Sequence, residues 1–137
     1  MAFNFRRKIQ DFKELQRNLP VIIGNMAKNH YTKSFRDQGF TDNGLDPWAQ
    51  RKSKDKSDRR SPARPRAILV KTGHLRGSIR VRVATFNAIE IGAYGVPYAV
   101  FHNRGTNKLP KRQFIGKSVK LERSIRARIR QEMKKVL

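Results

Sequence analysis

The side chains best suited to chemistry in this chain are its three histidines, His30, His74 and His102. They lie in separate segments without HxH or HxxxH spacing, and the chain has no cysteine, so the pattern does not indicate a metal site. A hydrolytic set would need His102, Ser78 and an aspartate, but no nucleophile-elbow motif surrounds that serine. No glycine-rich phosphate loop is present either. We therefore expect no enzymatic activity, no metal and no cofactor.

The segment 98–116, YAVFHNRGTNKLPKRQFIG, stands out for a different reason. It begins with a short apolar run, turns between Gly105 and Pro110, and ends in a second apolar pair. Gly105 marks a turn that a Cβ would obstruct, and Pro110 opposes a regular helix across this region. We expect His102 and Asn103 to form local hydrogen bonds. These four residues therefore predict a shaped loop between two anchored ends.

The same segment carries polar side chains that we expect to be exposed and to contact another protein: Arg104, Thr106, Lys108, Lys111 and Arg112. A loop held on a rigid base presents a defined surface, which suits recognition. The alternative interpretation is that the HNRGT motif forms only a tight structural turn.

The N-terminal region is the first element that must support this loop. Apolar residues at helical spacing predict an amphipathic helix from Phe5 to Leu19, and a helical pattern resumes after Pro20 and runs to Phe35. Because proline is poorly tolerated within a helix, we expect either two helices or one helix sharply kinked at Leu19–Pro20. Its apolar face would pack on the protein's own sheet or, alternatively, bind a partner.

The second half of the chain predicts strands followed by a helix. Residues 78–84 and 89–91 alternate apolar and polar side chains, which indicates an antiparallel hairpin with a cationic outer face. Residues 98–101 would continue the sheet or lead into a short helix. Apolar residues at four-residue spacing predict a helix over 121–136. The expected fold is a single α+β domain over residues 1–137, with a small antiparallel sheet of three to four strands packed against a long or kinked N-terminal helix and a C-terminal helix.

A region rich in turn-forming residues, 36–67, separates these two halves. We expect a basic, flexible loop or arm here because few apolar side chains are available to order it. Trp48 is the exception, and we expect it to pin the loop to the core rather than to stack on a nucleic-acid base. Eight cations against two aspartates give residues 51–66 a net charge of +6: Arg51, Lys52, Lys54, Lys56, Arg59, Arg60, Arg64 and Arg66.

The overall charge narrows the class of partner. The 137 residues carry a net charge of +22, and 31% of them are charged. A charge of this size favours contact with a polyanion or with an acidic protein surface. The chain has no apolar run of the ~20 residues that a membrane span needs, and its N-terminus lacks the apolar core of a signal peptide. We therefore expect a protein that is made in a cytoplasm and does not enter a membrane.

Three blocks of this sequence resemble the phage virion morphogenesis family: LVKTGHLRGSI at 69–79, YA with HNRGT at 98–106, and LPKRQFIG at 109–116, with Trp48 upstream. That family comprises tail-completion proteins at the head–tail neck of tailed bacteriophages. The resemblance implies a structural virion protein at the neck or tail end that forms a ring and contacts neighbouring neck and tail proteins. It also implies assembly in the host bacterial cytoplasm and non-specific contact with passing DNA. The alternative from the residues alone is a sequence-independent nucleic-acid-binding protein.

Overall fold

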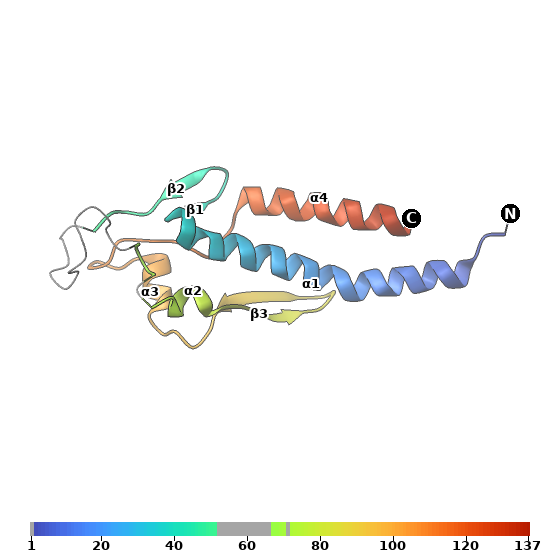
Figure 1. The fold of residues 1–137 in the computed structure, drawn as a ribbon, viewed down its shortest axis with the longest axis horizontal. Helices are drawn as coiled ribbons and strands as arrows, with labels where there is room; N and C mark the ends of the chain where they lie inside the picture. Colours follow the sequence, from blue (N-terminus) through green and yellow to red (C-terminus); the bar gives the residue numbers. More distant parts are fainter. Residues whose placement is uncertain (1, 52–66, 71) are drawn as a thin grey trace.

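One long helix organises the fold. The computed structural model describes residues 2–51, 67–70 and 72–137. In these ranges the helices and strands are, in chain order, α1 (Phe5–Asp37), β1 (Gly39–Thr41), β2 (Leu45–Pro47), α2 (His74–Gly77), β3 (Ile79–Ala84), β4 (Ile89–Ala93), α3 (Ala99–Arg104) and α4 (Val119–Val136). Figure 1 shows α1 along the long axis, with α4 along one side and the β3–β4 hairpin along the other. The fold is α+β with a long N-terminal and a C-terminal helix, as predicted.

Helix α1 continues through Pro20, so of the two expected alternatives, two helices or one helix kinked at Leu19–Pro20, the division into two helices is wrong. Pro20 has no N–H to donate to the carbonyl of Gln16, four residues earlier, and the helix loses that hydrogen bond. Packing offsets the loss, because Leu19, Pro20 and Gly24 are all buried. Gly24 lets the hairpin approach α1 closely, since a Cβ there would lie only 3.1 Å from a methyl carbon of Val81.

The first turns of α1 leave their large apolar side chains exposed, although Lys8 joins them to α4 through a hydrogen bond from its Nζ to the carbonyl of Val136 at 2.8 Å. Leu15 and Leu19 are buried, but Phe5, Ile9 and Phe12 on the same periodic face are 71%, 55% and 41% exposed. Figure 1 shows this end of α1 extending beyond both α4 and the tip of the β3–β4 hairpin. The expected packing of the apolar face on the protein's own sheet therefore does not apply to these first turns.

The first part of the expected arm is regular rather than irregular. Helix α1 runs to Asp37, and β1 and β2 then pair antiparallel with Phe40 opposite Asp46. Phe40 is buried and orders this hairpin, so the expected loop does not begin at residue 36. Of the expected arm cations, Arg51 is described and exposed. The other seven lie outside the described residues: Lys52, Lys54, Lys56, Arg59, Arg60, Arg64 and Arg66.

The described strands form two separate hairpins, not one sheet of three to four strands. β3 and β4 pair antiparallel as predicted, with a bulge between Val81 and Val83. After β4 the chain forms helix α3 instead of another strand, so the short helix expected as one alternative for residues 98–101 is confirmed. A two-stranded sheet is only marginally stable alone, and β3–β4 depends on its packing against α1.

The hydrophobic core lies at the end of the molecule that holds α2 and α3. Phe35, near the end of α1, meets Trp48 edge-on at 5.5 Å between ring centroids and meets Phe114 at 5.3 Å. The other buried members of this core are Ile68, Leu75, Ile79, Val96 and Ala99. Trp48 is only 4% exposed, which confirms that it pins its loop to the core.

Helix α4 confirms the predicted C-terminal helix and is capped from across the molecule. The hydroxyl of Ser118 accepts a hydrogen bond from the N–H of Leu121 and donates one to the carbonyl of Thr41 at 2.7 Å. Asp42, in the turn after β1, accepts a hydrogen bond from the N–H of Val119 at 2.8 Å. These contacts satisfy free N–H groups of the first turn and fix the start of α4 against the β1–β2 hairpin.

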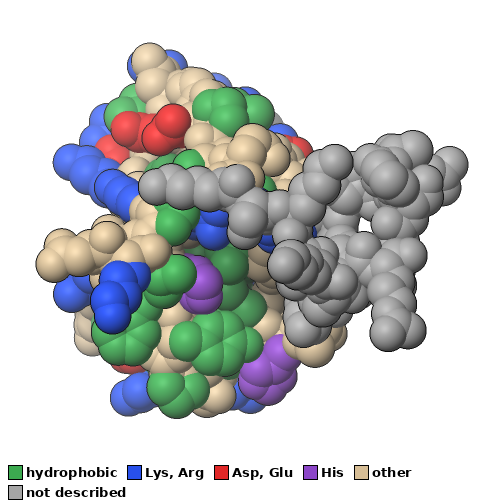
Figure 2. Space-filling model, turned by 90° about the vertical axis from the view of Figure 1, so that its left-hand side faces the viewer, with side chains coloured by type: hydrophobic (Ala, Val, Ile, Leu, Met, Phe, Trp, Pro, Cys, Tyr) green, Lys and Arg blue, Asp and Glu red, His purple; other side chains and the backbone are tan. Residues whose placement is uncertain are grey.

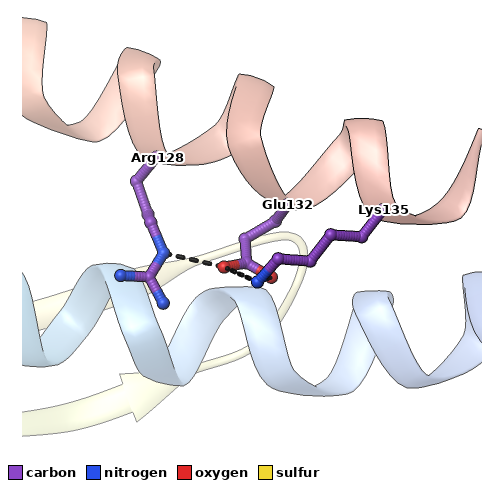
Figure 3. Close-up of polar contacts among 3 residues, drawn as sticks. All are labelled: Arg128, Glu132 and Lys135. Atoms are coloured by element: carbon purple, nitrogen blue, oxygen red, sulfur yellow. Dashed lines mark hydrogen bonds and ion pairs between the residues drawn. The ribbon is translucent and has the colours of Figure 1, made fainter.

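Glu132 lies on the side of α4 that faces α1 (Figure 3). Its carboxylate accepts hydrogen bonds from Nζ of Lys135 at 3.0 Å and from Nε of Arg128 at 2.8 Å. The side chain of Glu132 is 11% exposed. Hydrogen bonds from Lys135 and then from Arg128 outweigh burial and lower the pKa of Glu132. The ionised carboxylate therefore offsets one of two positive charges next to the α1–α4 contact.

Glu132→Gln should lower the melting temperature at neutral pH by a few degrees, because the two cations lose the carboxylate that offsets part of their charge. The pKa of Glu132 is lower in the folded protein than in the unfolded chain. Its contribution to stability is therefore fully present above the unfolded-state pKa and is lost as the pH falls through the folded-state pKa. The difference between variant and wild type should therefore shrink in acid. Thermal unfolding followed by circular dichroism tests this, with the exposed Glu14→Gln as the matched control. A difference that persists unchanged in acid would contradict the charge-based account.

Candidate functional site

The loop after α3 turns where only glycine fits. Gly105 has φ of +75°, and its N–H donates to the carbonyl of Phe101 at 2.8 Å. A Cβ on Gly105 would lie 2.8 Å from the backbone nitrogen of Lys111, which is too close for any larger residue. Thr106 then closes a tight turn, since its N–H donates to the carbonyl of Leu109 at 2.8 Å. Gly105 therefore shapes the loop as predicted.

Asn103 joins the two ends of the 98–116 segment. Its side-chain oxygen accepts hydrogen bonds from the N–H groups of Phe114 at 2.9 Å and Ile115 at 3.0 Å. Its amide nitrogen donates to the carbonyl of Ile115 at 3.0 Å. One side chain thus supplies three hydrogen bonds to backbone that lies in no helix or strand. The predicted local role of Asn103 is confirmed.

His102 supports the loop through its backbone and not through its ring. Its carbonyl accepts a hydrogen bond from the N–H of Arg112 at 2.8 Å. The expected side-chain bond is not formed: the ring atom Nδ1 is buried and has no hydrogen-bond partner among the described residues. The ring instead packs edge-on against Tyr98, 6.0 Å between centroids. Burial, with a smaller effect from the nearby Arg112, lowers the pKa of His102 and favours the neutral ring.

Two aromatic side chains from elsewhere in the fold hold the end of the segment. The indole nitrogen of Trp48 donates to the carbonyl of Gln113 at 2.7 Å. The hydroxyl of Tyr31, on α1, donates to the carbonyl of Gly116 at 3.0 Å. Phe114, between these two points, is 1% exposed. The segment therefore ends inside the core and not on the surface.

Arg112 is buried, so the expectation that it is exposed is wrong. Only 8% of its surface is accessible, and its guanidinium donates to the carbonyl of Ala49 through Nε at 3.0 Å and Nη2 at 2.8 Å. Burial is the main reason that the pKa of Arg112 is lowered. The residue ties the loop to the backbone after Trp48 and serves the fold instead of an outer surface.

The other four expected contact residues are exposed, and so is the loop-shaping Pro110. Next to them, Tyr98, Val100 and Phe101 are 45%, 44% and 52% exposed, and Leu109 is also exposed. Figure 2 views this end of the molecule and shows hydrophobic side chains gathered there with Lys and Arg around them. We call this set the α3 surface: Tyr98, Val100, Phe101, Arg104, Thr106, Lys108, Leu109 and Lys111.

Sequence reasoning missed the apolar half of the α3 surface. The sequence predicts that the apolar run Tyr98 to Phe101 anchors one end of the loop, but of these four residues only Ala99 is buried. A helix of six residues has too few turns to bury three large apolar side chains on one side. The signal available in the sequence was the position of this run directly before a loop rich in cations.

The serine considered for hydrolysis is buried and forms a local hydrogen bond. Ser78 is 6% exposed, and its hydroxyl donates to the carbonyl of Leu75 at 2.6 Å. Within the described ranges, no group of three or more His, Asp or Glu side chains is placed to hold a metal ion. Among the described helices, none has the length and apolar content to span a bilayer.

Asn103→Ala should destabilise the protein by about 2 kcal/mol, because the part-buried N–H groups of Phe114 and Ile115 lose their partner and the carbonyl of Ile115 keeps only the donor from Gln113. Asn103→Asp is the matched variant: its oxygens still accept from both N–H groups but cannot donate to Ile115. We expect it to unfold at a urea concentration between those of the alanine variant and wild type. Equal stability of the alanine variant and wild type would show that the amide does not hold the segment.

Comparison with known proteins places these features in a family. The family model described as the phage virion morphogenesis family matches residues 5–134, from the first turn of α1 almost to the end of α4. No curated protein sequence and no solved structure matches the chain significantly. The match therefore includes both long helices as well as the sequence blocks around Gly73 and Gly105. The chain belongs to the phage virion morphogenesis family and has a structural or assembly role in the phage virion.

Proposed function

We propose that this protein is a structural subunit at the head–tail neck or tail end of the virion, where it completes the tail or joins it to the head. It forms a ring with copies of itself, contacts neighbouring neck and tail proteins, and performs no catalytic turnover. Assembly takes place in the cytoplasm of the host bacterium. The observation that carries this proposal is the exposure of apolar side chains at both ends of the long molecule.

Exposed apolar side chains that gather in one place commonly mark a surface that another protein covers. At one end Phe5, Ile9 and Phe12 follow one another along the first turns of α1. At the other end lies the apolar part of the α3 surface. A subunit with different contact surfaces at its two ends can join its neighbours head to tail, and such contacts close into a ring when the rotation between subunits allows it.

The α3 surface is suited to recognition because its base is rigid. Asn103, Trp48 and Tyr31 each hold backbone of the segment by hydrogen bonds, so its exposed side chains are already positioned before binding. Binding to an ordered surface costs less conformational entropy than binding that must order a loop. We place the contact with a neighbouring subunit, or with the next layer of the virion, at this surface.

The cations of the α3 surface select the partner. Arg104, Lys108 and Lys111 are exposed around the apolar side chains, so a matching partner would present acidic groups around an apolar patch. Arg112 is left out of this contact because it is buried.

Val100→Ser combined with Phe101→Ser should block assembly and leave the fold intact, since both side chains are about half exposed. In a phage that lacks the wild-type gene, we expect infectious particles to fall at least about tenfold, because apolar side chains at the centre of a contact carry much of its binding free energy. Unjoined heads and tails should accumulate and can be counted by electron microscopy. Phe86→Ser, at the exposed tip of the β3–β4 hairpin, is the matched control and should assemble normally.

A second double variant tests the contribution of charge to assembly separately from that of apolar contact. Arg104→Glu with Lys111→Glu changes exposed cations only and should also reduce assembly. Wild-type yields of infectious particles from both double variants would refute this placement of the contact. Loss of soluble, folded protein would show instead that these side chains serve the fold. Negative-stain images of the purified protein, alone and with tails, test the ring.

A further inference from the structure

The outward side of α4 carries a row of cations. Positions 120, 123, 126, 130 and 134 follow at intervals of three or four residues, so they share about a third of the helix circumference. All five side chains are exposed, and none pairs with a carboxylate of the described residues. We call these residues, with one exposed alanine among them, the α4 cation row: Lys120, Arg123, Arg126, Ala127, Arg130 and Lys134.

The opposite side of α4 is occupied by the fold, and a carboxylate offsets part of its positive charge. Leu121 is buried, and Glu132 pairs with Arg128 and Lys135 next to α1. The outward side has no such pairing within the described chain. Five like charges along one helix face repel one another. An external anion along this side would relieve that repulsion.

We propose that the α4 cation row binds the phosphate backbone of double-stranded DNA. The centre of a typical protein–protein interface is poor in charged residues and rich in aromatic ones. The row has the opposite composition, since Ala127 is its only apolar member. Protein–DNA interfaces are polar and strongly positive, which is the composition that α4 presents. The α3 surface, with its exposed Tyr98 and Phe101, has instead the composition of a protein contact.

The geometry of the row favours duplex DNA over other polyanions. From Lys120 to Lys134 the row extends about 21 Å along a regular helix. Duplex DNA carries about one negative charge per 1.7 Å of its axis, so several phosphates lie within reach of each part of the row. Proteins that bind single strands add aromatic side chains on which the bases stack, and the row has none. A second copy of the same row is excluded as the occupant because its charge has the same sign.

Binding of this kind is independent of sequence, because phosphate contacts carry no information about the bases. DNA binding by the α4 cation row goes beyond the proposed structural role. It does not depend on that role, since α4 and the α3 surface are separate parts of the fold. A neck subunit could lose its contact with DNA and still join its neighbours. Failure of one proposal therefore leaves the other in place.

The test is the salt dependence of binding to a duplex of random sequence, measured by fluorescence anisotropy with the full chain. The variant Arg123→Gln/Arg126→Gln/Arg130→Gln removes three exposed cations and keeps residues that favour a helix. Each lost phosphate contact should reduce the slope of log K against log salt by about 0.9. The triple variant should therefore have a slope smaller in magnitude by about 2–3 than wild type.

A second triple variant removes the same amount of charge from another part of the surface. It distinguishes binding at the α4 cation row from an effect of net charge alone. Arg76→Gln/Arg80→Gln/Arg82→Gln removes three exposed cations from α2 and β3. We expect it to change the slope by less than half as much. Equal effects of the two triple variants would overturn the proposal, because they would mean that only total charge matters. Equally tight binding to poly-L-glutamate would favour an acidic protein as the occupant, and a preference for single strands would also contradict the proposal.

A single substitution in the middle of the row gives an independent check. Ala127→Glu places a carboxylate among the five cations, and Ala127→Gln places a neutral side chain of the same size there. The glutamate variant should bind the duplex at least about fivefold more weakly than the glutamine variant at moderate salt. Both substitutions are exposed and compatible with a helix, so circular dichroism should show unchanged folding. Equal affinity of the two variants would contradict binding at this face.

Discussion

Three hydrogen bonds from one amide, that of Asn103, determine how the α3 end of the molecule is built. They hold the backbone at Phe114 and Ile115, which has no strand partner, at the place where Phe114 enters the core. Because this end is fixed, the carbonyl of Gln113 meets Trp48 and the carbonyl of Gly116 meets Tyr31 on α1. The exposed residues between Arg104 and Lys111 are consequently attached to a rigid part of the core. Contact with another protein then needs no prior ordering of this loop.

Charge is arranged by the same fold. The chain has 32 Lys and Arg against 10 Asp and Glu, so its carboxylates are scarce. Two of them lie where helices join the rest of the structure: Asp42 caps α4, and Glu132 pairs with two cations beside α1. Many of the exposed cations in the described ranges lie on surfaces of different composition. The α3 surface mixes cations with exposed aromatic rings, whereas the outward side of α4 has almost no apolar character.

Much of the fold could be predicted because local patterns determine it. Three features depend only on near neighbours in the chain: the period of the apolar residues in α4, the alternation of side chains in β3, and the turn at Gly105. Features that depend on distant groups could not be predicted. Arg112 resembles any loop cation until the carbonyl of Ala49 is placed beside it. The periodicity of Phe5, Ile9 and Phe12 identifies an apolar face, but it does not show whether another element covers that face.

The end of the 98–116 segment is part of the core and holds the α3 surface in an ordered state. Native-state hydrogen exchange of single backbone amides tests this most directly. The account predicts that the amides of Phe114 and Ile115 exchange as slowly as those of the buried turns of α1, because both N–H groups bond to Asn103 next to a buried ring. The amide of the exposed Asn107 should exchange much faster. Exchange of Phe114 and Ile115 at the rate of Asn107 would contradict the account, since the segment would then open independently of the core.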